Sequence, residues 1–198
     1  MRHIHTTLIL PLLLATALLS TSCMRQDSRC TNLMGNGRYC LQTTTVIVPF
    51  EVQQKVEATI KNHHETMVTE IEVNAKGMQM IALTPFGHKL VHVSYNNEEA
   101  KAVVSPDSRL DPTLMIAMIQ LALWPTESVR KGLNAPLHLE EGAGKRRYLA
   151  NDKLVLEIQY LDVQYADAMT PANKFQLSFP SADLKLDIET LPEVEPVQ

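Results

Sequence analysis

Residues 67–83 read MVTEIEVNAKGMQMIAL, and apolar and polar side chains alternate on both sides of a central Asn-Ala-Lys-Gly run. Ile71 and Val73 share one face of an extended segment, and Met78 and Met80 share one face of the next. A short run that contains Asn and Gly is typical of the turn of a β-hairpin. The stretch therefore predicts two antiparallel strands, each with one apolar face.

The same alternation recurs along most of the chain, so the protein is predicted to be mainly β. Asn151-Asp152 has the composition of a two-residue hairpin turn between two of these segments. About ten short strands joined by tight turns favour one continuous antiparallel sheet, curved into an incomplete β-barrel. Besides 67–73 and 78–82, strands are predicted at residues 56–60, 90–95, 100–104, 137–140, 146–150, 154–160, 175–179 and 184–188.

One segment interrupts the β pattern. Asp111 and Pro112 have the composition of a helix N-cap and a first helical position, and Pro125 marks the end of the helix. Every residue but one from 114 to 124 is apolar, and a helix that is apolar all round is normally buried on all sides. We expect this helix to plug the hollow of the curved sheet. The alternative is an ordinary core helix that covers the sheet of an α+β domain.

The N-terminus has the pattern of an export signal. Arg2 supplies a positive charge, residues 8–19 are almost wholly aliphatic, and small residues 20–22 precede Cys23. The apolar run is shorter than the roughly 17–25 residues that span a bilayer. Residues 19–23, Leu-Ser-Thr-Ser-Cys, resemble the bacterial lipoprotein signal. The resemblance implies that the chain is cleaved before Cys23 and that Cys23 is then acylated. Met24, in place of an aspartate, favours the outer membrane, with the domain facing the periplasm. The alternative is an ordinary signal peptide with a coincidental cysteine.

The sequence divides into four parts: a signal peptide at 1–22, a tether at 23–44, one domain at 45–191 and an acidic, proline-rich tail at 192–198. The tail is predicted to be disordered because it has too few apolar residues to bury. Cys30 and Cys40 are expected to form a disulfide in an oxidising periplasm. Two reduced thiols are the alternative.

Nothing in the sequence predicts catalysis, a cofactor or a metal site. The net charge is −4, and no basic stripe suggests nucleic acid as a partner. His88 and His92 share a strand face, but four residues along a strand span about 13 Å, which is too far for one metal ion. Residues 145–147, Lys-Arg-Arg, are expected at a solvated hairpin tip, with contact to anionic head groups as the alternative.

Two short motifs carry a family resemblance. Leu-Thr-Pro-Phe-Gly at 83–87 and Leu-Trp-Pro at 123–125, with the strand order around them, resemble an uncharacterised bacterial lipoprotein family. That family is often encoded beside fatty-acid-like or aryl-polyene synthesis genes, and its layout is similar to that of LolB. The resemblance covers residues 65–190. It implies a LolA/LolB-like, incompletely closed barrel whose hydrophobic hollow, lidded by helices, takes up acyl chains. The loop at 74–77 lacks the protruding apolar residue that LolB uses, so insertion of lipoproteins is not expected.

The residues expected to line the ligand hollow are apolar, and several of the nine methionines are among them. Flexible thioether side chains repack around irregular apolar guests. The expected lining is Met78, Met80, Phe86, Leu114, Met115, Met118, Leu121 and Trp124. The sequence therefore predicts a lipid-anchored protein that binds or shuttles acyl or polyene chains, with a periplasmic carrier or an inner-membrane exporter as a further partner. The alternative is an accessory lipoprotein that docks on an exporter or an outer-membrane protein and uses the hollow only as core.

Overall fold

The computed structural model describes residues 28–33, 37–105, 110–161 and 172–192. The predicted signal peptide, Cys23 and all but the first residue of the acidic tail lie outside these ranges.

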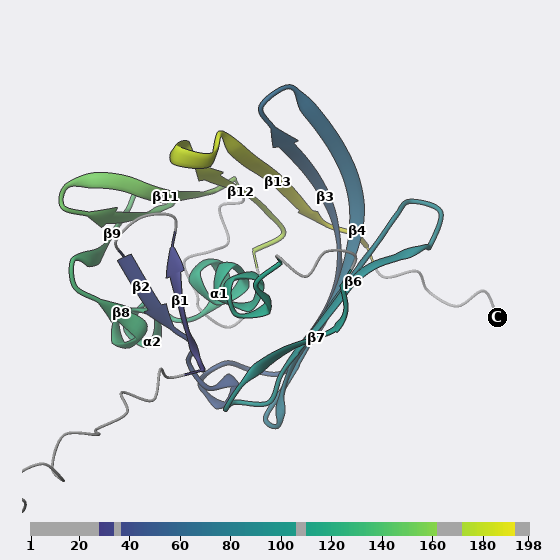
Figure 1. The fold of residues 1–198 in the computed structure, drawn as a ribbon, viewed down its shortest axis with the longest axis horizontal. Helices are drawn as coiled ribbons and strands as arrows, with labels where there is room; N and C mark the ends of the chain where they lie inside the picture. The colour runs from purple at the N-terminus through teal and green to yellow at the C-terminus, as the bar shows by residue number, and fades with distance from the viewer. Residues whose placement is uncertain (1–27, 34–36, 106–109, 162–171, 193–198) are drawn as a thin grey trace, which may run out of the picture.

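Ten strands form one antiparallel sheet in the order β7-β6-β5-β4-β3-β13-β12-β11-β10-β9. Figure 1 shows that the sheet is strongly curved, and β7 and β9 are its two edges. Because no pairing joins these edges among the described strands, the predicted mainly β, incompletely closed architecture is confirmed. The bounds are β3 (Phe50–Ile60), β4 (His63–Asn74), β5 (Gly77–Leu83), β6 (Lys89–Tyr95), β7 (Ala100–Val104), β9 (Leu137–Gly142), β10 (Lys145–Ala150), β11 (Lys153–Tyr160), β12 (Lys174–Phe179) and β13 (Leu184–Thr190).

The turns form where the sequence predicts them. Asn74 pairs with Gly77 across the β4–β5 hairpin, and its side-chain oxygen accepts a hydrogen bond from the backbone N–H of Lys76 at 2.9 Å. Asn151 and Asp152 both have positive φ, at 50° and 61°, as a two-residue hairpin between β10 and β11 requires. A 3-10 turn, η3 (Pro180–Ala182), joins β12 to β13.

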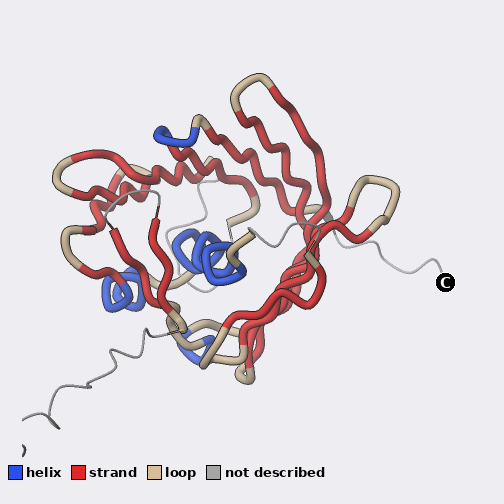
Figure 2. The backbone as a smooth tube through the Cα atoms, viewed as in Figure 1, coloured by secondary structure: helices blue, strands red, loops and turns tan. Residues whose placement is uncertain are grey.

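Helix α1 (Pro112–Leu123) lies inside the curve of the sheet (Figures 1 and 2). The Asp111 carboxylate accepts a hydrogen bond from the backbone N–H of Thr113 at 2.8 Å, which is the predicted N-cap. Trp124 is the C-cap and Pro125 follows, where the short helix α2 (Thr126–Gly132) begins. The expected position of the helix in the hollow is therefore confirmed.

The expected tether at 23–44 is wrong from Cys30 onward. A small three-stranded sheet joins β1 (Cys30–Leu33) and β2 (Gly37–Cys40) to β8 (Leu133–Asn134), and η1 (Thr44–Val46) follows it. A disulfide links Cys30 to Cys40, as expected. Leu33, Tyr39 and Leu41 are fully buried in the core. These apolar residues are few and lie in four-residue strands, so the periodicity of the sequence is too short to reveal them.

Candidate ligand cavity

A cavity of about 430 Å³ lies between α1 and the inner face of the sheet. Its walls come from β3, β4, β5, β12 and β13, and all but three of the described residues that line it are apolar. The strands contribute side chains such as Val56, Ala58, Ile71, Leu177 and Leu186, which follow the inward phase of the alternation. The volume falls within the roughly 300–1,000 Å³ of pockets that bind small molecules.

The two faces of α1 explain why the helix is apolar all round. Leu114, Met115 and Met118, spaced at helical periodicity, line the cavity and are only half buried. Ile116 and Leu121 do not line the cavity and are fully buried in the core. One side of the helix therefore completes the core, and the other presents apolar surface to the cavity.

The structure divides the predicted lining residues into two groups. Met80, Leu114, Met115 and Met118 line the cavity. The other four lie elsewhere: Met78, Leu121 and Trp124 are buried in the core, and Phe86 is exposed.

The placement of Phe86 in the cavity is wrong because Phe86 belongs to the β5–β6 turn. Its side chain is 89% exposed. Hydrogen bonds from Gly87 N to Thr84 O at 2.9 Å and from His88 N to the Thr84 hydroxyl at 3.1 Å fix this turn. The expected place of Met78, Leu121 and Trp124 in the lining is also wrong. Apolar character predicts burial, but it does not distinguish core from cavity wall.

The only polar residue between 114 and 124, Gln120, attaches the N-terminal segment to the helix. Its side-chain oxygen accepts hydrogen bonds from the Tyr39 hydroxyl at 3.1 Å and from Gln42 N at 2.8 Å, and its amide donates to Gln42 O at 2.8 Å. The indole N–H of Trp124 donates to Thr43 O at 3.1 Å. Segment 39–43 thus holds α1 on the side of the helix that faces away from the cavity. The Tyr39 hydroxyl that takes part in this contact is buried, and burial raises the pKa of Tyr39 well above its ordinary value.

Arg146 fixes the C-terminal end of α1. Its guanidinium donates to the backbone oxygens of Leu121 at 3.1 Å, Ala122 at 3.3 Å and Trp124 at 2.9 Å. The hydroxyls of Tyr148 and Tyr160 donate to the same end of the helix. A cation at a helix C-terminus also interacts favourably with the helix dipole.

The prediction of a solvated tip at 145–147 is therefore wrong for Arg146. This residue is only 2% exposed, and its side chain points inward from β10. Glu141 pairs with the Arg146 guanidinium at 2.9 Å. Partial burial by itself raises the pKa of Glu141, but hydrogen bonds from Thr126 and Arg146 and the charges of Arg146 and Arg130 outweigh it and hold this pKa below its ordinary value.

Three of the described residues that line the cavity are polar: Gln54, Thr69 and Asp111. The Asp111 carboxylate already accepts hydrogen bonds from Thr113 N at 2.8 Å and the Thr31 hydroxyl at 2.6 Å. Neither Gln54 nor Thr69 was predicted from the sequence. The alternation of the strand could have indicated Gln54, because every second residue from Gln54 to Val56 and Ala58 faces the same, inward side of the sheet.

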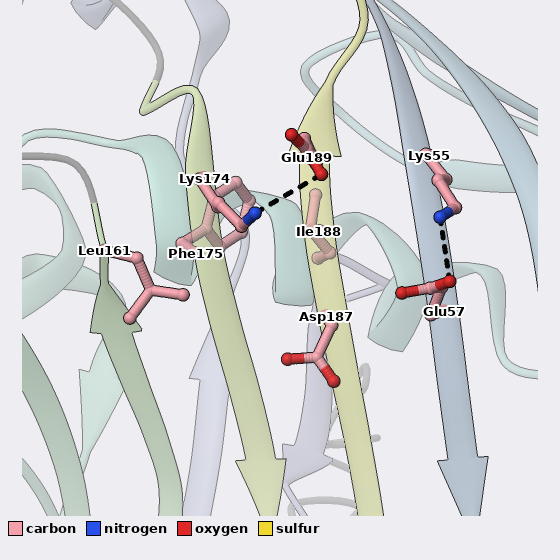
Figure 3. Close-up of a pocket in the computed structure, with 8 residues that line it drawn as sticks. All are labelled: Lys55, Glu57, Leu161, Lys174, Phe175, Asp187, Ile188 and Glu189. Atoms are coloured by element: carbon pink, nitrogen blue, oxygen red, sulfur yellow. Dashed lines mark hydrogen bonds and ion pairs between the residues drawn. The ribbon is translucent and has the colours of Figure 1, made fainter.

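A second, smaller cavity of about 160 Å³ lies on the outer face of β3, β12 and β13 (Figure 3). Four of its charged side chains form two ion pairs, Lys174 with Glu189 at 3.4 Å and Lys55 with Glu57 at 2.8 Å. The fifth, Asp187, pairs with Lys185 at 3.2 Å. Hydrogen bonding and the charge of Glu57 raise the pKa of Lys55. Because each of these charged side chains already has an ion-pair partner and the volume is below the usual range for ligand pockets, this cavity is not the candidate site.

Two further searches of the described residues bear on the site. Within residues 28–33, 37–105, 110–161 and 172–192, no group of His, Cys, Asp and Glu side chains could hold a metal ion. In the same part of the chain, no helix is long and apolar enough to cross a membrane.

Comparison with known families places the chain. Residues 51–192 match the model of a family described as "Protein of unknown function (DUF3261)". The chain belongs to this family. The matched segment contains both the cavity walls and α1 and begins after the segment that carries β1 and β2. Among solved structures, a LolA superfamily protein from Nitrosomonas europaea is similar, with a TM-score of 0.45 and 6% identity over 79% of this chain and 91% of that chain. No curated protein sequence matches.

Proposed function

We propose that this protein binds an acyl or polyene chain in the cavity between α1 and the sheet, and that it holds or shuttles such lipids in the bacterial envelope. The observation that carries the proposal is the cavity-facing side of α1. Leu114, Met115 and Met118 stay half buried against an apolar space of about 430 Å³. Water can form few hydrogen bonds in such a space. An apolar chain that enters it is stabilised by about 25 cal/mol for each Å² of apolar surface that it buries.

The geometry supports binding and gives no support to catalysis. Among the described residues of the lining, one side chain is ionisable, that of Asp111, and its carboxylate already accepts hydrogen bonds from the helix N-terminus and Thr31. Acid–base or nucleophilic chemistry requires a side chain that is free to reach the reacting atom. We therefore propose a carrier or receptor and no enzymatic activity.

The proposal extends to the place of the protein in the cell. Acylation of Cys23 would anchor the chain to the outer membrane, with the domain in the periplasm, where a carrier or an inner-membrane exporter would deliver or accept the lipid. The pattern of residues 1–23 supports this part of the proposal. The disulfide between Cys30 and Cys40 is consistent with an oxidising compartment.

A photoactivatable acyl chain tests the binding. Cells that produce the full chain are fed a diazirine-bearing fatty acid and irradiated, and the labelled peptides are mapped by mass spectrometry. We expect label on peptides from α1 and from β3 and β4, separate from any label on the Cys23 peptide, which would report the anchor.

Two matched variants complete this test. Ala58→Trp fills the cavity and should remove the label from α1, whereas Thr59→Trp, on the outer face of the same strand, should leave it unchanged. Label that is confined to the Cys23 peptide of a well-folded protein would contradict the proposal.

One observation favours a second function, an accessory lipoprotein that docks on an exporter or an outer-membrane protein. Phe86 is 89% exposed on a turn that hydrogen bonds keep rigid. An exposed aromatic side chain on a fixed turn is suited to a protein contact. Under this second function, Phe86→Ser would abolish co-purification of a stoichiometric partner, and the cavity would carry no label.

A further inference from the structure

One row of polar side chains crosses the apolar wall of the cavity. Gln54 on β3 lies opposite Thr69 on β4 and opposite Thr190 on β13. The next row toward the β3–β4 turn is apolar, with Val56 opposite Met67. The polar row is therefore a distinct feature of three adjacent strands within an apolar surface.

Gln54 is 2% exposed and lines the cavity. Its amide nitrogen donates to the Thr190 hydroxyl at 3.4 Å, and its backbone oxygen accepts from the Thr69 hydroxyl at 3.5 Å. The side-chain oxygen accepts no hydrogen bond from the residues that the structure describes. Exchanging the amide oxygen and nitrogen would only change which end is paired with Thr190. The side-chain oxygen is not among the fully buried atoms without a partner, so it keeps accessible surface, and Gln54 lines the cavity. One end of the amide is therefore available to a group bound in the cavity.

We infer that the lipid bound in the cavity carries an uncharged hydrogen-bonding group, such as a hydroxyl, and that the side chain of Gln54 binds this group. The inference rests on the proposed function and specifies its ligand. A hydroxyl both donates and accepts, so it can pair with either end of the amide. The Thr69 hydroxyl lies opposite Gln54 in the same row and can accept a second hydrogen bond.

The charges of the lining explain why the group is uncharged. No lysine, arginine or histidine is among the described residues that line the cavity, and the one ionisable residue there is the acidic Asp111. A carboxylate buried beside Gln54 would have no cation to pair with, which is unfavourable by several kcal/mol. A free fatty-acid anion therefore fits this cavity less well than a hydroxylated chain of the same length.

The position of the row also defines how far the group enters. Ile60, at the end of β3, is the lining residue with the largest exposure given, 46%, and exposure on the inward face of β3 falls to 2% at Gln54. Six residues along a strand span roughly 20 Å. A chain that enters beside Ile60 would place its polar group at Gln54 after that distance, with apolar wall on the way.

The test compares two ligands with two proteins. All measurements use the full chain with Cys23→Ser, in which no attached acyl group can compete for the cavity. 1-Dodecanol and dodecane displace the fluorescent apolar probe N-phenyl-1-naphthylamine, and each gives a dissociation constant. Gln54→Leu should raise the ratio of the dodecanol constant to the dodecane constant roughly tenfold, because it removes one buried hydrogen bond to the alcohol only. Gln53→Leu changes the same residue type on the outer face of the same strand and should leave the ratio unchanged.

Each outcome decides the matter. A ratio that Gln54→Leu leaves unchanged, with both ligands bound, overturns the role of Gln54 and leaves the proposed function intact. Dodecanoate binding more tightly than dodecanol at pH 7 overturns the preference for an uncharged group. Failure of the probe and both ligands to bind a folded protein overturns the proposed function, and this inference with it. If Gln54→Leu does not fold, Gln54→Met, which keeps an unbranched side chain of similar length, provides the same comparison.

Discussion

Arg146 shows how a single buried cation can determine the position of a whole helix. Its guanidinium contacts the backbone oxygens of Leu121, Ala122 and Trp124 and the carboxylate of Glu141. A helix leaves its last backbone oxygens without hydrogen-bond partners inside the helix, and the Arg146 guanidinium supplies a partner for them. The end of α1 is thus fixed to β10, and the cavity-facing side of the helix keeps its orientation.

Replacement of Arg146 should therefore destabilise the fold. We expect Arg146→Leu to lower the free energy of unfolding by about 3 kcal/mol, because it leaves backbone oxygens and Glu141 without their buried partner. Chemical denaturation followed by circular dichroism measures this quantity. Arg147→Leu is the matched control: Arg147 is an exposed neighbour on the same strand, and its ion pairs should contribute less than about 1 kcal/mol. Equal losses in the two variants would show that Arg146 has no special role.

At the scale of the element, α1 has two apolar sides with different roles. The sequence predicted its start at Asp111 and Pro112 and its end before Pro125, because caps and prolines are local signals. It did not predict which side faces the cavity, since Met118 and Leu121 are both apolar and their difference depends on distant strands. The attachment of α1 to segment 39–43 through Gln120 also escaped prediction, because a contact across about 80 residues leaves no local pattern.

The two sides of α1 should respond differently to truncation. Leu121→Ala removes a fully buried side chain and should lower the free energy of unfolding by about 3 kcal/mol. Met118→Ala only enlarges a space that already exists, so its cost should stay below about 1 kcal/mol without ligand. Thermal or denaturant unfolding of the delipidated protein measures both. A cost for Met118→Ala as large as that for Leu121→Ala would mean that the cavity side is ordinary packed core.

At the scale of the whole molecule, the strands of the ten-stranded sheet were predictable from the sequence, and their order in the sheet was not. Alternation located the segments that became β3, β4 and β5, and turn residues identified their hairpins, because both depend on neighbouring residues. The pairing of β13 with β3 joins residues 184–190 to 54–60, and periodicity carries no information on such a partner. The cavity depends on this pairing, since Ile188 and Val56 meet in its wall. Its polar row, formed by three strands, could therefore emerge only from the folded arrangement.

The proposed acylation of Cys23 can be tested directly. β1 begins at Cys30, seven residues after Cys23, and seven extended residues reach at most about 25 Å. Acylation of Cys23 would therefore hold the domain close to the membrane surface, where acyl chains are available to the cavity. We expect the wild-type protein to carry the mass of its acyl groups and to sediment with the outer membrane. Cys23→Ser should lack that mass, keep its uncleaved signal peptide and no longer sediment with the outer membrane, whereas Cys30→Ser, which removes only the disulfide, should remain there. If Cys23→Ser carried no acyl mass and still sedimented with the outer membrane, another part of the protein would be responsible for the attachment.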